Sequence, residues 1–173
     1  MVVGEKRGTE LTPGARDQMI VRVGSSRSRL RLFSAQAPRT AELLRDLAAL
    51  GTAFPVRHAV HSGPEISCPI DASEHSLSTR VSTMKLENAV HEPDMGDLVV
   101  VCAAPGRWGH FPTSPLIDIG IFYRAGGRLS FPFGDIEGCR VGQIDHDDLA
   151  DLQAAASQIQ SGRPMSLKLE IAL

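Results

Sequence analysis

The residues best suited to chemistry lie in one short segment that holds two histidines, a serine and a glutamate. His58 and His61 are three residues apart, and Ser62 and Glu65 flank a Gly-Pro pair that favours a turn. A histidine and a carboxylate held close together can exchange a proton with a substrate. We therefore take His58, His61 and Glu65 as candidate catalytic residues and Ser62 as a candidate ligand-binding residue. The simpler alternative is a turn in which the Ser62 hydroxyl bonds to the backbone.

The same histidines are poorly placed to share a metal ion. Residues three apart on an extended strand point to opposite faces, and catalytic zinc needs three protein ligands. The three cysteines, at positions 68, 102 and 139, lie far apart and show no zinc-binding spacing. We expect no metal site and no cofactor, and we interpret the cysteines as buried free thiols.

A second group of candidates is aromatic. Trp108 is the only tryptophan, and it lies in a loop rich in glycine and proline at residues 105–115. Long structured loops often carry function. Together with Phe122, Tyr123 and Arg128, Trp108 could line an aromatic pocket with one cation for a small anionic or planar ligand. The alternative is that Trp108 only covers one end of the fold.

Composition and charge exclude several classes of protein. A chain of 173 residues with a net charge of −2 fits one domain and argues against nucleic-acid binding, which depends on clustered Lys and Arg. The longest apolar run, residues 98–104, is too short to cross a membrane, and residues 1–12 lack the apolar stretch of a secretory signal. We expect a cytoplasmic protein that binds a small molecule, not a nucleic acid or a membrane. The apolar side chain of Phe111, in a loop, would favour self-association into a homo-oligomer.

One local exception to the acidic balance is a run of alternating arginines. Arg27, Arg29 and Arg31 would share one face of a strand. A solvated stripe that protects a sheet edge is the interpretation that the pattern favours. An anion-binding site is the alternative.

Apolar periodicity predicts about eight strands and two helices. One helix begins at Pro38 and stops at Gly51, and the other follows Asp145 and stops at Gly162. Residues 1–17 show no period and are predicted to be a flexible tail before a single domain at 18–173. Strands are expected at 19–23, 29–33, twice within 54–70, and at 81–86, 98–104, 116–123, 141–144 and 165–173. The run at 98–104 is apolar on both faces, so we expect it to be covered on both sides.

Several stretches resemble known proteins. Residues 30–44, Leu-Arg-Leu-Phe-Ser-Ala-Gln-Ala-Pro-Arg-Thr-Ala-Glu-Leu-Leu, resemble the opening of cyclophilins, where a strand leads into a helix that starts Ala-Pro-Lys-Thr. The order of motifs at 58–66, 96–97, 121–124, 128–134 and 141–144 is similar to that of a family of small, uncharacterised bacterial proteins with a cyclophilin-like fold. The resemblance implies a mainly β fold, namely a closed cyclophilin-like barrel of about eight strands with two helices packed at its ends.

The resemblance to cyclophilins does not extend to their prolyl isomerase motifs. Those enzymes have a Phe-His-Arg segment, whose arginine polarises the substrate amide, followed by Gln-Gly-Gly-Asp. Here the corresponding residues are Phe54-Pro-Val-Arg57-His58 and then Ser62-Gly-Pro-Glu65. Arg57 could stand in for the arginine, so it is kept as a candidate ligand-binding residue, but the glutamine-bearing motif is absent.

These observations give three hypotheses of function. The first is a small-molecule-binding domain whose cleft is bordered by residues 57–65, 105–115 and 122–128. The second is an enzyme that uses His58 or His61 with Glu65 as acid and base in the same cleft, with Arg128 as an anchoring group. The third is a peptidyl-prolyl isomerase.

Overall fold

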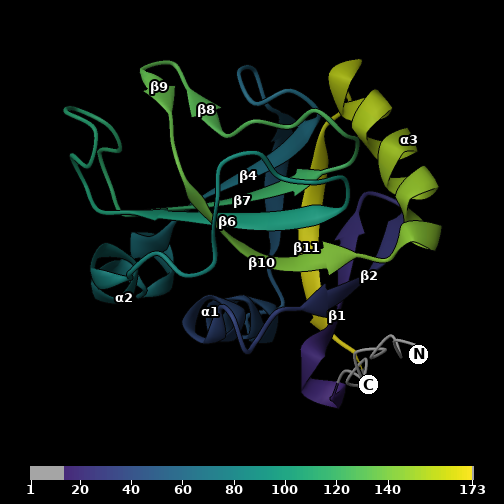
Figure 1. Ribbon diagram of the computed structural model, residues 1–173, viewed down its shortest axis with the longest axis horizontal. Coiled ribbons are helices and arrows are strands. Elements are labelled where there is room, and N and C mark those ends of the chain that lie inside the picture. Colours follow the sequence, from purple (N-terminus) through teal and green to yellow (C-terminus); the bar gives the residue numbers. More distant parts are fainter. Residues whose placement is uncertain (1–13, 173) are drawn as a thin grey trace, which may run out of the picture.

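The computed structural model describes residues 14–172, and in it eight antiparallel strands close into a barrel (Figure 1). Their order around the barrel is β2-β1-β11-β3-β4-β7-β6-β10, and β10 pairs back with β2. The strands are β1 (Gln18–Val23), β2 (Ser26–Leu32), β3 (Ala53–His58), β4 (Glu65–Asp71), β6 (Asp97–Ala103), β7 (Leu116–Phe122), β10 (Gly138–Ile144) and β11 (Met165–Ile171). A two-residue strand, β5 (Ala89–Val90), adds to β10. The predicted fold class is confirmed.

Two long helices pack on this barrel. Helix α1 (Pro38–Ala49) lies against β10 and β11, and α3 (Leu149–Gln160) lies against β2 and β3. Each buries a stripe of leucines, as the periodicity predicted. The start of α1 is capped by the carboxylate of Glu87, which accepts hydrogen bonds from the backbone N–H groups of Arg39 and Thr40 at 3.1 and 3.0 Å.

The segment after β4 differs from the prediction. The expected strand at 81–86 is wrong, because Ser78–Thr83 form a short helix, α2, and the chain extends only from Met84. The turn Ala72–His75, η2, precedes that helix, and Val81 is the buried residue that fixes it against the barrel. Residues 1–13 of the predicted tail lie outside the described residues, whereas Ala15–Asp17 form a short 3-10 turn, η1.

A second apolar layer covers part of the outer surface of the barrel. Residues 128–136, called the flap here, cross the outside of β6 and β7 and carry the small hairpin of β8 (Ser130–Phe131) and β9 (Gly134–Asp135). Val99 and Phe122 point outward from the barrel and pack beneath Leu129 of the flap. The prediction that residues 98–104 are covered on both faces is therefore confirmed.

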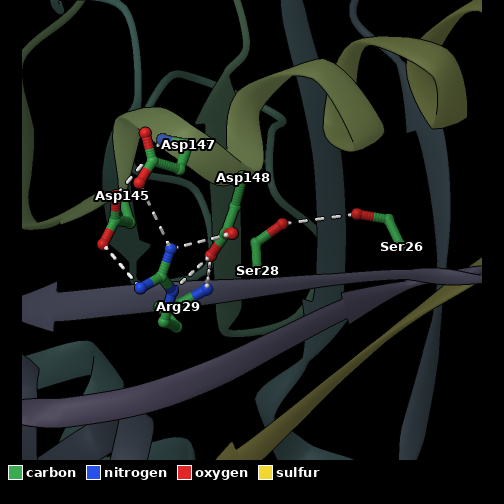
Figure 2. A network of polar contacts seen from close by, with 6 residues as sticks. All are labelled: Ser26, Ser28, Arg29, Asp145, Asp147 and Asp148. Carbon is green, nitrogen blue, oxygen red and sulfur yellow. Dashed lines mark hydrogen bonds and ion pairs between the residues drawn. The ribbon is translucent and has the colours of Figure 1, made fainter.

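The alternating arginines do share the outer face of β2, as predicted, since the residues between them are buried. Figure 2 shows Arg29 reaching three aspartates that precede α3. Its guanidinium lies 3.3 Å from Asp145, 3.9 Å from Asp147 and 2.9 Å from Asp148, and Asp145 caps the turn His146–Asp148, η3. Arg29 thus ties β2 to the start of α3, and its charge is paired with these carboxylates.

None of the helices within residues 14–172 is both long and apolar enough to span a membrane.

Candidate functional site

The flap and the outer surface of β3, β4 and β7 enclose a cleft with a volume of about 390 Å³. The floor is formed by polar side chains of the strands, and one wall by aromatic side chains of the flap and of the 105–115 loop. The residues that line it are Arg57, Ala59, Val60, His61, Ser62, Glu65, Ser67, Phe111, Asp118, Ser130, Phe131, Pro132 and Phe133.

Two carboxyl groups lie at the floor of the cleft. Glu65 is on β4 and Asp118 is on the neighbouring strand β7. Both point away from the barrel interior, because they alternate with isoleucines that face the core. Their exposures are only 5% and 7%, since the flap covers the outer face at this point. Burial of two acids on one face of the sheet is costly unless one of them keeps its proton.

Burial raises the pKa of both acids, and for Glu65 the charge of Asp118 acts in the same direction. Loss of solvent, followed by the negative charge of Asp118, raises the pKa of Glu65 to about 8, against opposing effects of the nearby Ser62 hydroxyl and the Arg57 guanidinium. Burial also raises the pKa of Asp118, although the Ser67 hydroxyl donates a hydrogen bond to its Oδ1 at 2.9 Å. Near neutral pH the Glu65 carboxyl is therefore mainly protonated, so it offers a hydrogen-bond donor as well as an acceptor.

The Glu65 carboxyl can lie at the floor because it packs closely against the backbone of Gly120. Gly120 on β7 lies beside Glu65, and a Cβ at that position would overlap the Glu65 carboxyl. A small cavity of about 20 Å³ lies behind the two acids, between Gly120 and the flap residues Leu129 and Ile136. That volume is about the size of one water molecule.

The aromatic wall is a cluster of four rings. Phe111, Phe131 and Phe133 face the cleft, and Trp108 packs behind them. Its ring centroid lies 6.2, 5.3 and 5.2 Å from those of Phe111, Phe131 and Phe133, respectively. Trp108 lines a different hollow, on the far side of the cluster. It therefore supports the wall from behind and does not face the cleft.

Ser62 joins the loop after β3 to the flap. Its hydroxyl donates to the carbonyl of Ser130 and accepts from the Ser130 N–H, each at 3.2 Å, and its carbonyl accepts from the N–H of Arg128 at 3.1 Å. Arg57 and His61 stand at the rim, where both are exposed. The far end of the flap is held by His91, whose Nδ1 lies 3.0 Å from the carbonyl of Ile136.

The structure brings four of the predicted site residues into the cleft: Arg57, His61, Ser62 and Glu65. His58 is turned away. Its Nδ1 donates to the carbonyl of Ala59 at 2.8 Å, which leaves Nε2 to accept from the Tyr123 hydroxyl at 2.7 Å and from the Gln160 amide on α3 at 3.2 Å. The acid–base pair that the geometry assembles is thus Glu65 with Asp118, and His58 takes no part in it.

The other predicted ligand contacts also lie outside the cleft. Phe122 is fully buried under the flap, Tyr123 is in the barrel core, and Arg128 is bound to Asp135 within the flap, with Nε 3.2 Å from Oδ2. The cleft is bordered by the tip of the flap instead of the 122–128 turn. These residues position the flap and the wall.

Nine lining residues were not among the predicted site residues: Ala59, Val60, Ser67, Phe111, Asp118, Ser130, Phe131, Pro132 and Phe133. Asp118 had one usable signal, because it is a lone charge in the apolar strand Leu116–Phe122. The phenylalanines had none, since apolar residues near glycine and proline are equally typical of ordinary packing.

The remaining reactive side chains are inert. Burial raises the pKa of the Cys68 and Cys102 thiols to about 12 and that of Cys139 to about 11, so all three stay protonated and weakly nucleophilic. Cys68 and Cys139 are buried, while Cys102 is partly exposed in spite of its apolar surroundings in the sequence. Across residues 14–172, no three His, Cys, Asp or Glu side chains gather in a way that could hold a metal ion.

Comparisons with known proteins agree with the fold. The profile of a family described as protein of unknown function (DUF3830) matches residues 19–169. The structure of McbB in complex with tryptophan superposes with a TM-score of 0.63 at 14% identity, over 88% of this chain and 44% of the McbB chain. The chain thus spans less than half the length of McbB. A cyclophilin-type peptidyl-prolyl cis-trans isomerase of Cryptosporidium parvum superposes with a TM-score of 0.51 at 13% identity, over 91% of this chain and 98% of that chain. No curated protein sequence matches significantly.

Proposed function

Since the chain belongs to the DUF3830 family and has a cyclophilin-like barrel, we propose that it binds a small organic molecule in the cleft beneath the flap. The observation that carries this proposal is the buried pair of Glu65 and Asp118 at the foot of an aromatic wall. A volume of about 390 Å³ lies in the range of small-molecule sites, which combine apolar walls with a few polar groups at one end.

The energetics of the floor favour an occupant. Glu65 is 5% exposed, and the nearby Ser62 hydroxyl, the side-chain hydrogen-bond partner that lowers its pKa, is also bonded to the backbone of Ser130. Burial of a carboxyl costs free energy, part of which a ligand group that bonds to it recovers. The phenylalanines then offer the ligand body an apolar surface on the side opposite the acids.

A second candidate function is acid–base catalysis in the same cleft. The specific observation in its favour is that the pKa of Glu65, at about 8, lies close to neutral pH, where a group both gives and takes protons efficiently. Asp118 would take the part of the partner that holds or receives the proton, in place of a histidine. His61 is exposed at the rim of the same cleft.

McbB was solved with tryptophan, a small molecule with an aromatic body. At 14% identity this likeness supports a shared fold only, so tryptophan is one probe among several in a ligand screen.

The proposal is tested by screening small aromatic and polar molecules for saturable binding by calorimetry. Intrinsic fluorescence supplies a second readout for non-fluorescent probes, because Trp108 is the only tryptophan and packs on every ring of the wall. We expect at least one ligand whose affinity falls about tenfold or more in Phe131→Ala, as expected for the loss of an aromatic contact.

The matched control is Leu50→Ala, since Leu50 is also a large apolar residue but is 47% exposed and does not line the cleft. That variant should leave ligand affinity unchanged. A screen in which no ligand distinguishes Phe131→Ala from Leu50→Ala contradicts the proposal.

A further inference from the structure

The two acids at the floor of the cleft form no ion pair with the described part of the protein. Within residues 14–172, no Lys, Arg or His forms an ion pair with either Glu65 or Asp118. Another buried acid, Asp97, does have a cationic partner, because its Oδ1 lies 2.8 Å from the Nε of Arg140. Two buried acids on one face of the sheet, with Arg57 near enough to act on both but in ion-pair contact with neither, leave a position that a positive charge would occupy favourably.

The basic groups that line the cleft lie at its rim. Arg57 and His61 are both exposed, so an anionic ligand bound to them would remain in contact with water and would be repelled from the acids below. A neutral ligand would satisfy hydrogen bonds but leave the charge of the floor uncompensated. The position of the charges therefore favours a ligand whose deepest group is a cation.

The wall favours the same class of ligand. Phe111, Phe131 and Phe133 present ring faces and edges beside the acids, with centroids 5.4 to 6.3 Å apart. A cation held near such rings gains cation–π attraction, and the rest of the molecule gains apolar contact. An ammonium group is compact and has several hydrogen-bond donors for the two carboxyls.

We propose that the cleft selects small organic amines with an aromatic or apolar body, and that the ammonium group pairs with the carboxyls of Glu65 and Asp118 at the floor. This inference rests on the proposed function, because it names the class of molecule that the cleft would bind.

The pairing of the ammonium group with Glu65 has a defined proton balance. The amine enters already protonated, Glu65 loses its proton to the buffer, and the resulting carboxylate and Asp118 both pair with the ammonium. The groups that face Glu65 are Asp118 from β7, Arg57 from β3, and His61 and Ser62 from the loop after β3. On the flap, Arg128 and Asp135 neutralise each other. The proton lost is thus assigned to the acid pair.

Three probes that share a phenyl ring and differ in their polar head group test the preference for a cation: 2-phenylethylamine, 2-phenylethanol and phenylacetate. We expect the amine to bind at least about tenfold more tightly than the other two at neutral pH. Calorimetry of the amine in two buffers of different ionisation enthalpy should show release of about one proton per molecule bound. Its affinity should rise between about pH 6 and pH 8 and level off near pH 9, because Glu65, with a pKa of about 8, is then mainly ionised in the free protein.

The matched variants are Glu65→Gln and Glu74→Gln. Glu65→Gln keeps the shape of the side chain and removes the charge, so we expect it to reduce amine affinity about tenfold or more, abolish proton release, and leave affinity for the alcohol within about twofold. Glu74→Gln changes an exposed glutamate outside the cleft and should behave like the wild type. If Glu65→Gln does not fold, Asp118→Asn and the pH series on the wild type still show whether amine binding depends on the acids of the floor.

The outcomes separate the two proposals. Equal affinities for the three probes, or amine binding without proton release and insensitive to both acid variants, overturn the inference while the cleft remains a binding site. Failure of every probe and every screened molecule to bind the wild type overturns the proposed function as well.

Discussion

The carboxyl group of Glu65 occupies the space where a Cβ on Gly120 would lie, so the two residues pack against each other across β4 and β7. Any side chain at position 120 would have to move the carboxyl or separate the strands. The placement of Glu65 at the floor of the cleft therefore depends on a glycine of the neighbouring strand.

Gly120→Ala tests this dependence. We expect the added methyl group to destabilise the protein by about 1–3 kcal/mol, as for overpacking of a filled interior, and to weaken binding of 2-phenylethylamine by displacing Glu65. Urea denaturation and calorimetry measure the two effects. Gly14→Ala is the control, since the nearest atom to a Cβ there is 3.9 Å away. Wild-type stability and amine affinity in Gly120→Ala would show that Glu65 is not held in this position.

The second prediction concerns stability as a function of pH. The pKa of Glu65 is about 8 in the folded protein and near 4.5 in the unfolded chain, so the folded state binds the proton more tightly. This stabilisation is complete below about pH 4.5 and is lost as the pH rises towards 8. Between about pH 5 and pH 8 the wild type should therefore lose up to roughly 1.4 kcal/mol per pH unit relative to Glu65→Gln, which does not ionise.

Urea denaturation of both proteins across this range gives the comparison, and Glu74→Gln, at an exposed position, should follow the wild type. A difference between the wild type and Glu65→Gln that does not vary with pH would show that Glu65 is already ionised in the folded protein.

The fold could be predicted because its signals are local. Met165–Ile171 alternate apolar and polar residues, and the helix from Pro38 repeats its leucines at helical spacing, so strand and helix follow from neighbouring residues alone. The prediction of a strand at 81–86 was wrong because the few apolar residues there fit both the helical and the strand period. There, a single buried contact of Val81 decided in favour of a helix.

The site could be predicted only where it is continuous in the sequence. Arg57, His61, Ser62 and Glu65 fall in one loop and its flanking strands, and the structure places all four at the cleft. Asp118 joins them only through the register of β4 and β7, and it is buried only because the flap crosses that face. Such pairings are set by tertiary contacts distant in the chain, which no spacing within a segment reveals.

The third prediction concerns the wall of the cleft. Phe133 and Ile171 are each 48% exposed, but only Phe133 faces the cleft. We expect Phe133→Ala to reduce affinity for 2-phenylethylamine and 2-phenylethanol alike, by about five- to tenfold, since both lose the same aromatic contact. Ile171→Ala should leave both affinities unchanged. A loss confined to the amine would mean that Phe133 acts on the charged head and not on the body of the ligand.

The last prediction concerns the attachment of α3 to the barrel. Arg29 contacts Asp145, Asp147 and Asp148, and the hydrogen bond from its guanidinium, together with its charge, holds the pKa of Asp148 below the usual range of a carboxyl (Figure 2). Arg29→Gln should therefore lower the melting temperature at low ionic strength, and the difference should shrink in about 1 M salt, where exposed charges are screened.

Acid should remove the same difference, because a carboxyl with a lowered pKa contributes stability above its unfolded pKa and loses it as the pH falls through the folded value. Arg27→Gln is the control, since Arg27 lies on the same face of β2 and makes no ion pair with residues 14–172. Equal melting temperatures for the two variants at every salt concentration would show that the helix is held by its leucines alone, and that the ion pairs of Arg29 contribute nothing measurable.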